Sequence, residues 1–361
     1  MSESLSIAAL GKLVDCWIAE GRHVTGPRRI NGRLLYARLD SAADLDLTED
    51  ERPRNSIKQV LFPRHEELYG YKLGHKRIEL TESETPIAEQ IVVAARPCDA
   101  ALGPILDHVF NWDYKDTQYN RRRELTTIVT LACRHHDAHC FCTSVGSAPD
   151  APRGSDVMLH AMDEGILEVC CLTEKGSRLF AGTCDNLPSP SSGRGAGGEG
   201  ISGDIANQPV LPLTPAISHR ENGTAPPRRF DLDKVQEFLA QGFEDSRWPD
   251  LARRCLGCGA CAYTCPTCHC FDIVDEGAGK EGVRARNWDA CQFVPFTLHA
   301  SGHNPRSRQN QRQRQRIYHK FRIYPEKFGP LLCTGCGNCT RNCPVGLGVA
   351  PVLAEIARNT P

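Results

Sequence analysis

Two nearly identical cysteine runs constrain this chain more than any other feature of its sequence. Each run has the spacing C-x2-C-x2-C-x3-C-P, and they occupy residues 255–266 and 333–344. Iron–sulfur clusters prefer thiolate ligands, and this spacing is typical of proteins that bind four-iron cubane clusters. Zinc is the weaker alternative, because zinc sites usually combine two CxxC pairs. The sequence therefore predicts two [4Fe-4S] clusters.

The fourth cysteine of each run is predicted to serve the other cluster. In two-cluster proteins with this spacing, the cysteine that precedes the proline ligates the neighbouring cluster. We therefore expect two crossed ligand sets. The first set consists of Cys255, Cys258, Cys261 and Cys343, and the second consists of Cys333, Cys336, Cys339 and Cys265.

The whole-chain composition bears on the compartment and on the class of partner. The chain has 361 residues and 19 cysteines. Eight of these cysteines belong to runs that require reduced thiols, and no basic secretory segment precedes them, so a disulfide framework explains the cysteines less well. No run of about 18 apolar residues suggests a membrane span. The formal net charge of −1 restricts any acidic partner to a local basic patch. We expect a cytoplasmic protein that contacts neither membranes nor nucleic acids.

Apolar periodicity predicts an α+β chain with two ordered parts. Residues 1–184 are expected to form a mixed α/β domain with a partly parallel sheet, which begins with an amphipathic helix that ends at Gly21 and has a strand at 56–63. Residues 185–228 are rich in Gly, Ser and Pro, so we expect a flexible insertion or linker. Residues 229–361 are predicted to form a helical ferredoxin-like domain that holds both clusters, because the gap between the runs is too long for the smallest two-cluster ferredoxins.

Four cysteines of the first domain could hold a third cluster. Cys98 and Cys133 each follow a predicted buried strand, at the edge where open α/β sheets usually bind ligands. Cys140 and Cys142 lie in the loop after the second of these strands. Four thiolates are enough for a cluster, but C-x-C is a weak ligand spacing, and ordinary buried thiols are the alternative. The sequence leaves both interpretations open.

Three further cysteines adjoin the first run in sequence or follow it at some distance. Cys268 and Cys270 extend the run to CPTCHC, and Cys291 follows later. Together with His269 they could bind another metal. We favour a supporting role beside the cubanes, of the kind that orients and tunes metal ligands.

The most basic segment lies between the two runs. Arg308, Arg312 and Arg316 recur at a four-residue step, so a helix would align them on one face, which Arg314 and Lys320 would widen. Cations beside negatively charged cubanes would stabilise the reduced clusters or dock an acidic partner. A solvated basic face and a nucleic-acid site are the weaker alternatives.

Five segments carry a resemblance to a known family: RPCDAA (96–101), ACRHHDAHCFCTSVG (132–146), CLGCGACAYTCPTCHCFD (255–272), HASGHNPR (299–306) and RQRIYHKF (314–321). Together they resemble the iron–sulfur β subunits of cytoplasmic NiFe hydrogenases of the sulfhydrogenase type. The related A subunit of anaerobic sulfite reductase is similar. The insertion at 185–228 departs from this family. The resemblance implies a subunit that passes electrons between a flavin subunit handling NAD(P)H and a catalytic partner.

We therefore expect an electron-transfer subunit of a multi-subunit oxidoreductase, without a substrate site of its own. The sequence offers no Rossmann fingerprint and no nucleophile with its base, so no catalytic residues are predicted. Two alternatives belong to other classes: an enzyme whose α/β domain binds a flavin or nicotinamide itself, and an iron–sulfur nucleic-acid module. The sequence does not decide between hydrogenase and sulfite reductase as the terminal partner.

Overall fold

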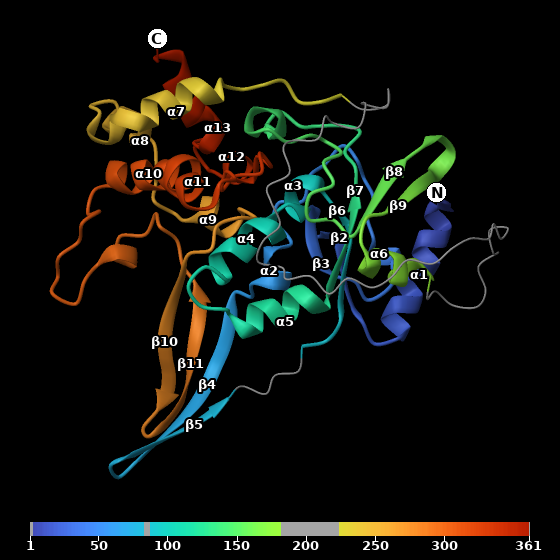
Figure 1. Ribbon diagram of the computed structural model, residues 1–361, viewed down its shortest axis with the longest axis horizontal. Helices are drawn as coiled ribbons and strands as arrows, with labels where there is room; N and C mark the ends of the chain where they lie inside the picture. Colours follow the sequence, from blue (N-terminus) through green and yellow to red (C-terminus); the bar gives the residue numbers. More distant parts are fainter. Residues whose placement is uncertain (1–2, 83–86, 182–223, 361) are drawn as a thin grey trace.

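The structure is a computed structural model that describes residues 3–82, 87–181 and 224–360 (Figure 1). The insertion predicted at 185–228 lies almost entirely outside these residues. Within the described ranges, no helix combines the length and the apolar character needed to cross a bilayer.

A seven-stranded sheet forms the centre of the N-terminal part, as far as the chain is described. Its strands are β1 (Glu3–Ser6), β2 (His23–Ile30), β3 (Arg33–Arg38), β6 (Gln90–Ala95), β7 (Thr126–Leu131), β8 (Val157–Ala161) and β9 (Ile166–Cys171). They lie in the order β1-β9-β8-β7-β6-β2-β3. The neighbours β2, β6, β7 and β8 are parallel, and the remaining pairs are antiparallel. The predicted mixed sheet is confirmed.

Helices cover both faces of this sheet (Figure 1). One face carries α1 (Ile7–Ala19) and α6 (Glu174–Ala181). The other carries α2 (Lys58–Leu61), α3 (Pro97–Ala100), α4 (Leu102–Phe110) and α5 (Thr117–Leu125). Helix α1 buries the apolar face expected from its sequence against the strands, with Leu10, Leu13, Val14 and Trp17 in the core.

The segment 56–63 contains helix α2, so the expected strand is wrong. Its apolar side chains recur at the three- to four-residue spacing of a helix and are buried: Ile57, Val60 and Leu61. The helix also directs Lys58 towards the C-terminal part, where its Nζ donates to the backbone carbonyls of Ala262 and Cys268. Contacts with residues distant in sequence therefore decide the local structure here.

A second sheet of four strands joins the two described parts of the chain. Its order is β10 (Phe271–Ala278), β11 (Glu281–Trp288), β4 (His65–Gly74) and β5 (Arg77–Glu82), and all neighbours are antiparallel. It extends away from the rest of the molecule (Figure 1). The β10–β11 hairpin lies between the two cysteine runs, where we expected helices and loops. Because β11 pairs with β4, the predicted domains 1–184 and 229–361 share one sheet.

The remaining C-terminal segments pack as helices around the cysteine runs (Figure 1). They are α7 (Leu232–Gln241), α8 (Trp248–Ala252), α9 (Ala260–Tyr263), α10 (Gln309–Tyr318), α11 (Tyr324–Phe328), α12 (Asn338–Arg341) and α13 (Val349–Arg358). A π-helical turn, His319–Ile323, joins α10 to α11. Apolar side chains of α7, α10 and α13 form one core, against which Cys261, Cys333 and Cys339 pack. The cysteines are thus held by a rigid helical layer.

A buried group of ion pairs fixes the second sheet to α5. Arg286 on β11 is only 5% exposed, and it bonds to Glu66 on β4 and to Asp116 at the N-terminus of α5. Glu66, also 5% exposed, pairs with Arg122 of α5 as well. Buried charges are stable only when they are paired in this way. The group therefore sets the position of the sheet beside the helix.

We expect Arg286→Gln to lower the free energy of unfolding by about 3 kcal/mol, because Asp116 loses its buried cation and Glu66 keeps only Arg122. Arg284→Gln is the matched control, since Arg284 lies on the same strand and pairs with Asp275 at an exposed position. The control should have little effect. Urea unfolding followed by tryptophan fluorescence measures both variants, and equal losses of stability would contradict the role given to Arg286.

Candidate metal centre

Both cysteine runs adopt the same local backbone, which depends on glycine. Gly335 and Gly337 have φ values of 71° and 76°, and their counterparts Gly257 and Gly259 have 66° and 73°. Helices α9 and α12 follow directly and carry the third cysteine of each run. A Cβ at Gly335 would lie 2.4 Å from the Cα of Cys142. Glycine is therefore required both for the turn and for the close approach of this loop.

Cys265 lies beside the cysteines of the second run, as the crossed assignment requires. Burial raises the pKa of Cys333 to about 12, Lys320 opposes the rise, and the nearby Cys265 adds to it. Burial also raises the pKa of Cys336 well above its ordinary value, with contributions from Cys265 and Cys339. The structure therefore brings together all four residues of the predicted second set.

Of the first predicted set, the structure shows Cys255 and Cys261 close to each other. Burial raises the pKa of Cys261 to about 11, against the opposite effect of Arg316, and Cys255 is among the thiols close to it. Cys255 accepts a hydrogen bond from Gln309 Nε2 at 3.2 Å, and Cys258 is exposed. The Sγ of Cys343 accepts one from the backbone N–H of Leu347 at 3.3 Å. The assignment of Cys343 to this set stays a prediction.

Three buried cations surround the cysteine runs, and none has a carboxylate partner among the described residues. Lys58, Arg316 and Lys320 are each 2% exposed. Lys320 Nζ lies 3.4 Å from Cys265 Sγ. Arg316 donates to the carbonyl of Cys261 at 3.3 Å, but its Nε and Nη1 have no hydrogen-bond partner. Because buried charges need counter-charges, this environment fits anionic iron–sulfur clusters.

The chemical type of the donors also suits a cluster. In the part of the chain that the structure describes, no three His, Cys, Asp or Glu side chains converge closely enough to hold one metal ion. The donor set, all cysteine in each run, is the one that iron–sulfur clusters take.

Lys58 was not identified from the sequence, although a lone lysine within the apolar run SIKQVLFP was an available signal. Its Nζ donates to the carbonyls of Ala262 (3.2 Å) and Cys268 (2.9 Å) and lies 3.8 Å from the centroid of the Trp288 ring. Burial lowers its pKa to about 8, while Cys268 and neighbouring thiols act in the opposite direction. The N-terminal part therefore contributes a cation to the environment of the C-terminal cysteines.

One of the extra cysteines, Cys268, lies directly beside the second set, and the other two lie beside each other. Cys268 contacts Cys265, and Cys270 contacts Cys291. His269 is tied to its own loop, with Nδ1 3.1 Å from the carbonyl oxygen of Thr267. This arrangement is what a supporting layer around the cubane ligands requires, and that role stays the favoured interpretation.

Only part of the basic segment reaches the cysteines. Arg316, from the four-residue step, and Lys320, which was expected to widen that face, do so. Arg312 is buried too, but it donates to the backbone carbonyls of a neighbouring loop, at Gln292, Arg306 and Ser307. Arg314 lies away from the cysteines and pairs with Glu244, so the expectation that it would widen the face is wrong. The reason is geometric, since residues two apart on a helix point to nearly opposite sides.

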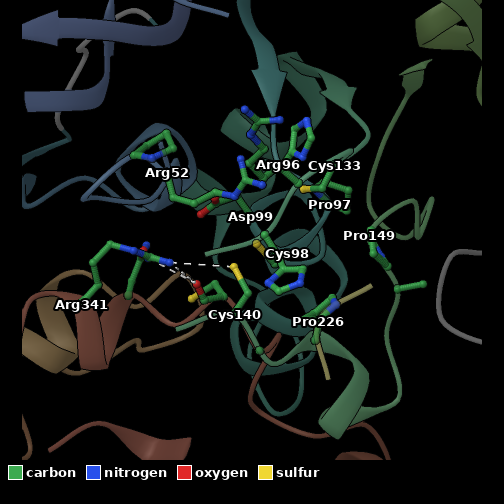
Figure 2. A pocket seen from close by; sticks show the side chains of 18 residues that line it. Arg52, Arg96, Pro97, Cys98, Asp99, Cys133, Cys140, Pro149, Pro226 and Arg341 are labelled. Atoms are coloured by element: carbon green, nitrogen blue, oxygen red, sulfur yellow. Dashed lines mark hydrogen bonds between the residues drawn. The ribbon is translucent and has the colours of Figure 1, made fainter. Parts of the chain in front are cut away.

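The four cysteines predicted for a third site line one cavity. Figure 2 labels three of them, Cys98, Cys133 and Cys140. Cys98 comes just after β6 and Cys133 just after β7, so both lie at the carboxyl edge of the sheet, and Cys140 and Cys142 approach from the following loop. Cys336 of the second run lines the same cavity, which was not anticipated. No sequence signal indicated this juxtaposition, because it depends on how the two parts pack.

Comparison with known proteins agrees with this geometry. Residues 254–347 match the family described as "4Fe-4S dicluster domain", which indicates two [4Fe-4S] clusters, as predicted. Sulfhydrogenase 2 subunit beta of Pyrococcus furiosus is 28% identical over 340 residues, which cover 94% of this chain and 93% of that protein. This similarity confirms the resemblance found from sequence motifs. No solved structure matches the chain significantly.

The crossed ligation predicts which cysteine variants resemble each other. We expect Cys343→Ser to alter the same paramagnetic signal as Cys255→Ser, and Cys265→Ser to alter the same signal as Cys333→Ser. Electron paramagnetic resonance of the dithionite-reduced variants distinguishes the signals. If Cys343→Ser instead matched Cys333→Ser, each run would keep its own fourth cysteine.

Lys320→Met should lower the reduction potential of at least one cluster, because it removes a buried positive charge beside Cys265. We expect a shift on the order of 60 mV, about 1.4 kcal/mol for a one-electron couple. Arg314→Met, on the opposite side of the same helical segment, is the control and should leave the potentials unchanged. Redox titration followed by electron paramagnetic resonance tests both, and identical potentials in the two variants would refute the tuning role.

Proposed function

We propose that this chain, an iron–sulfur electron-transfer protein with a 4Fe-4S dicluster domain, passes electrons between the catalytic subunit of a NiFe hydrogenase of the sulfhydrogenase type and a flavin-containing, NAD(P)H-linked subunit. One observation carries the proposal. Two complete cubane runs share a helical core with buried cations that have no carboxylate partner among the described residues. Similarity along 94% of the chain to a protein named as a sulfhydrogenase subunit supports the choice of partner.

The chain's own residues would hold, insulate and tune the redox groups. Clusters of this type supply uptake and release of one electron at a time. The cysteine thiolates hold them, and the core of α7, α10 and α13 keeps water away and keeps the ligands in place. Lys320 and Arg316 offset negative charge that accumulates on reduction, which favours the reduced state. Cleavage of dihydrogen and transfer of hydride to the nicotinamide would take place in the partner subunits.

Reduced thiols also support a cytoplasmic site for this complex. Cluster assembly requires free cysteines, and reducing compartments keep them available. We infer that the chain contributes electron conduction and partner contacts there. Substrate selectivity would belong to the subunits on either side.

The test is electron transfer in the assembled complex, purified with its partner subunits. We expect Cys255→Ala to reduce hydrogen-dependent NAD(P) reduction more than about tenfold, because the conducting path is broken, while hydrogen oxidation with a dye that accepts electrons directly from the catalytic subunit continues. Cys171→Ala is the matched control, since Cys171 lies outside both cysteine runs, on strand β9 of the seven-stranded sheet.

The chain purified alone distinguishes this function from that of a stand-alone enzyme. The chain purified without partners should contain iron and sulfide but neither flavin nor nicotinamide. Reduction of an artificial acceptor by NAD(P)H with the isolated chain would contradict the proposal. So would unchanged hydrogen-dependent NAD(P) reduction in the Cys255→Ala complex.

A further inference from the structure

A cavity between the main sheet and the second cysteine run is lined by four cysteines that the dicluster domain does not explain. We infer that it holds a third [4Fe-4S] cluster on Cys98, Cys133, Cys140 and Cys142. The inference rests on the proposed function and deepens it, because it extends the conducting path into the N-terminal part. The match to the dicluster domain covers residues 254–347, so none of these four ligands lies within it.

The fold itself brings the first two cysteines together. Strands β6 and β7 are parallel neighbours, with Ala95 opposite Thr130 near their ends. The chain leaves both strands at the same edge, and Cys98 and Cys133 follow within three residues. The backbone N–H of Cys133 donates to the carbonyl of Pro149 at 2.9 Å, which holds this thiol at the cavity wall. Parallel sheets bind ligands at this edge because the loops there converge.

The second pair is held in place by the second cysteine run. The N–H of Phe141 donates to the carbonyl of Gly335 at 2.9 Å, and Cys140 N–H donates to Asp137 Oδ1 at 3.1 Å. Asp137 is in turn paired with Arg341 of α12 at 2.6 Å. The loop with Cys140 and Cys142 is therefore ordered by contacts on both sides, as a ligand loop must be.

Two buried arginines on the cavity indicate that it contains negative charge. Arg96 is 3% exposed; its Nη2 donates to the carbonyl of Thr48, but Nε and Nη1 have no partner. Arg52 is 7% exposed, lines the same cavity and faces the thiols of Cys133, Cys140 and Cys98. Figure 2 shows both arginines beside these cysteines.

One carboxyl group also lines the cavity but does not pair with these arginines. Asp99 is 4% exposed; its Oδ2 accepts from the hydroxyl of Tyr36 at 3.2 Å, and its Oδ1 has no partner. Among the described residues, no carboxylate forms an ion pair with Arg96 or Arg52. If the four thiols were ordinary buried cysteines, neither of these guanidinium groups would form an ion pair with a described residue, although both are buried. Four thiolates around an iron–sulfur cluster supply an anion for both.

The position of Cys336 indicates where the third cluster would lie with respect to the other two. Cys336 belongs to the second predicted ligand set and lines the cavity of the third. The three clusters would therefore form a row, with the second in the middle. Each step would transfer one electron between neighbouring clusters, so that the donor cluster is oxidised by one electron and the acceptor cluster is reduced by one electron. No bond forms or breaks, and the step needs no other reactant.

The full-length chain, reconstituted anaerobically with iron and sulfide, tests the inference. We expect about twelve iron atoms per chain and three paramagnetic signals after reduction. The double variant Cys98→Ala/Cys133→Ala should retain about eight iron atoms and both dicluster signals. Cys171→Ala, a cysteine outside the cavity, should retain about twelve. About eight iron atoms in the parent chain, or about twelve with three signals in the double variant, would overturn the third cluster.

A second variant keeps the test valid if the double variant does not fold. Arg96→Gln should change the potential of one signal, that of the third cluster, and leave the other two unchanged. A parent chain without a third signal, or a variant with all three potentials unchanged, counts against the site. The outcome is separate from that of the proposed function. About eight iron atoms per chain, with intact hydrogen-dependent NAD(P) reduction, would contradict only the third cluster. About twelve iron atoms per chain, without hydrogen-dependent NAD(P) reduction, would contradict only the proposed function.

Discussion

Positive charge buried beside cysteine thiols is the constraint on which the rest of this structure depends. Lys58, Arg316 and Lys320 come from α2, α10 and the π-helical turn, yet they converge on the same group of sulfurs. An isolated buried cation is costly, so these residues are stable there only with an anionic group between them. Clusters held by thiolates supply that charge. We therefore expect folding and cluster binding to be coupled, as in other metal-dependent domains.

This coupling explains why the two parts of the chain are joined so extensively. The N-terminal part supplies Lys58, strand β4 and the loop that contacts Gly335, while the C-terminal part supplies the hairpin that completes the second sheet. A protein that conducts electrons benefits from this construction, because distances between redox groups must not change. The buried Arg286 group and the shared sheet join the two parts without using any cysteine of the runs.

Sequence reasoning succeeded where the signal was local. The cysteine spacing predicted the clusters, the apolar periodicity of 7–19 predicted α1, and short apolar runs predicted β6 and β7 with cysteines after them. It failed for α2, where four to eight apolar residues fit a strand and a helix equally well. It also placed Arg314 with its neighbours, although the helix turns it towards Glu244. The β10–β11 hairpin was missed because its pairing partner, β4, lies far away in sequence.

The sequence by itself determined the kind of group that the two cysteine runs bind, and it predicts which cysteines are the ligands. Two-residue spacers place successive thiolates around one cluster whatever surrounds them, because that geometry depends only on the chain between them. Only the tertiary structure decided which other distant residues meet at these sites: Lys58 with the first run, and Cys336 with the cavity of Cys98. The physical reason is that burial and pairing of charge depend on the packing of whole elements, which no local pattern encodes.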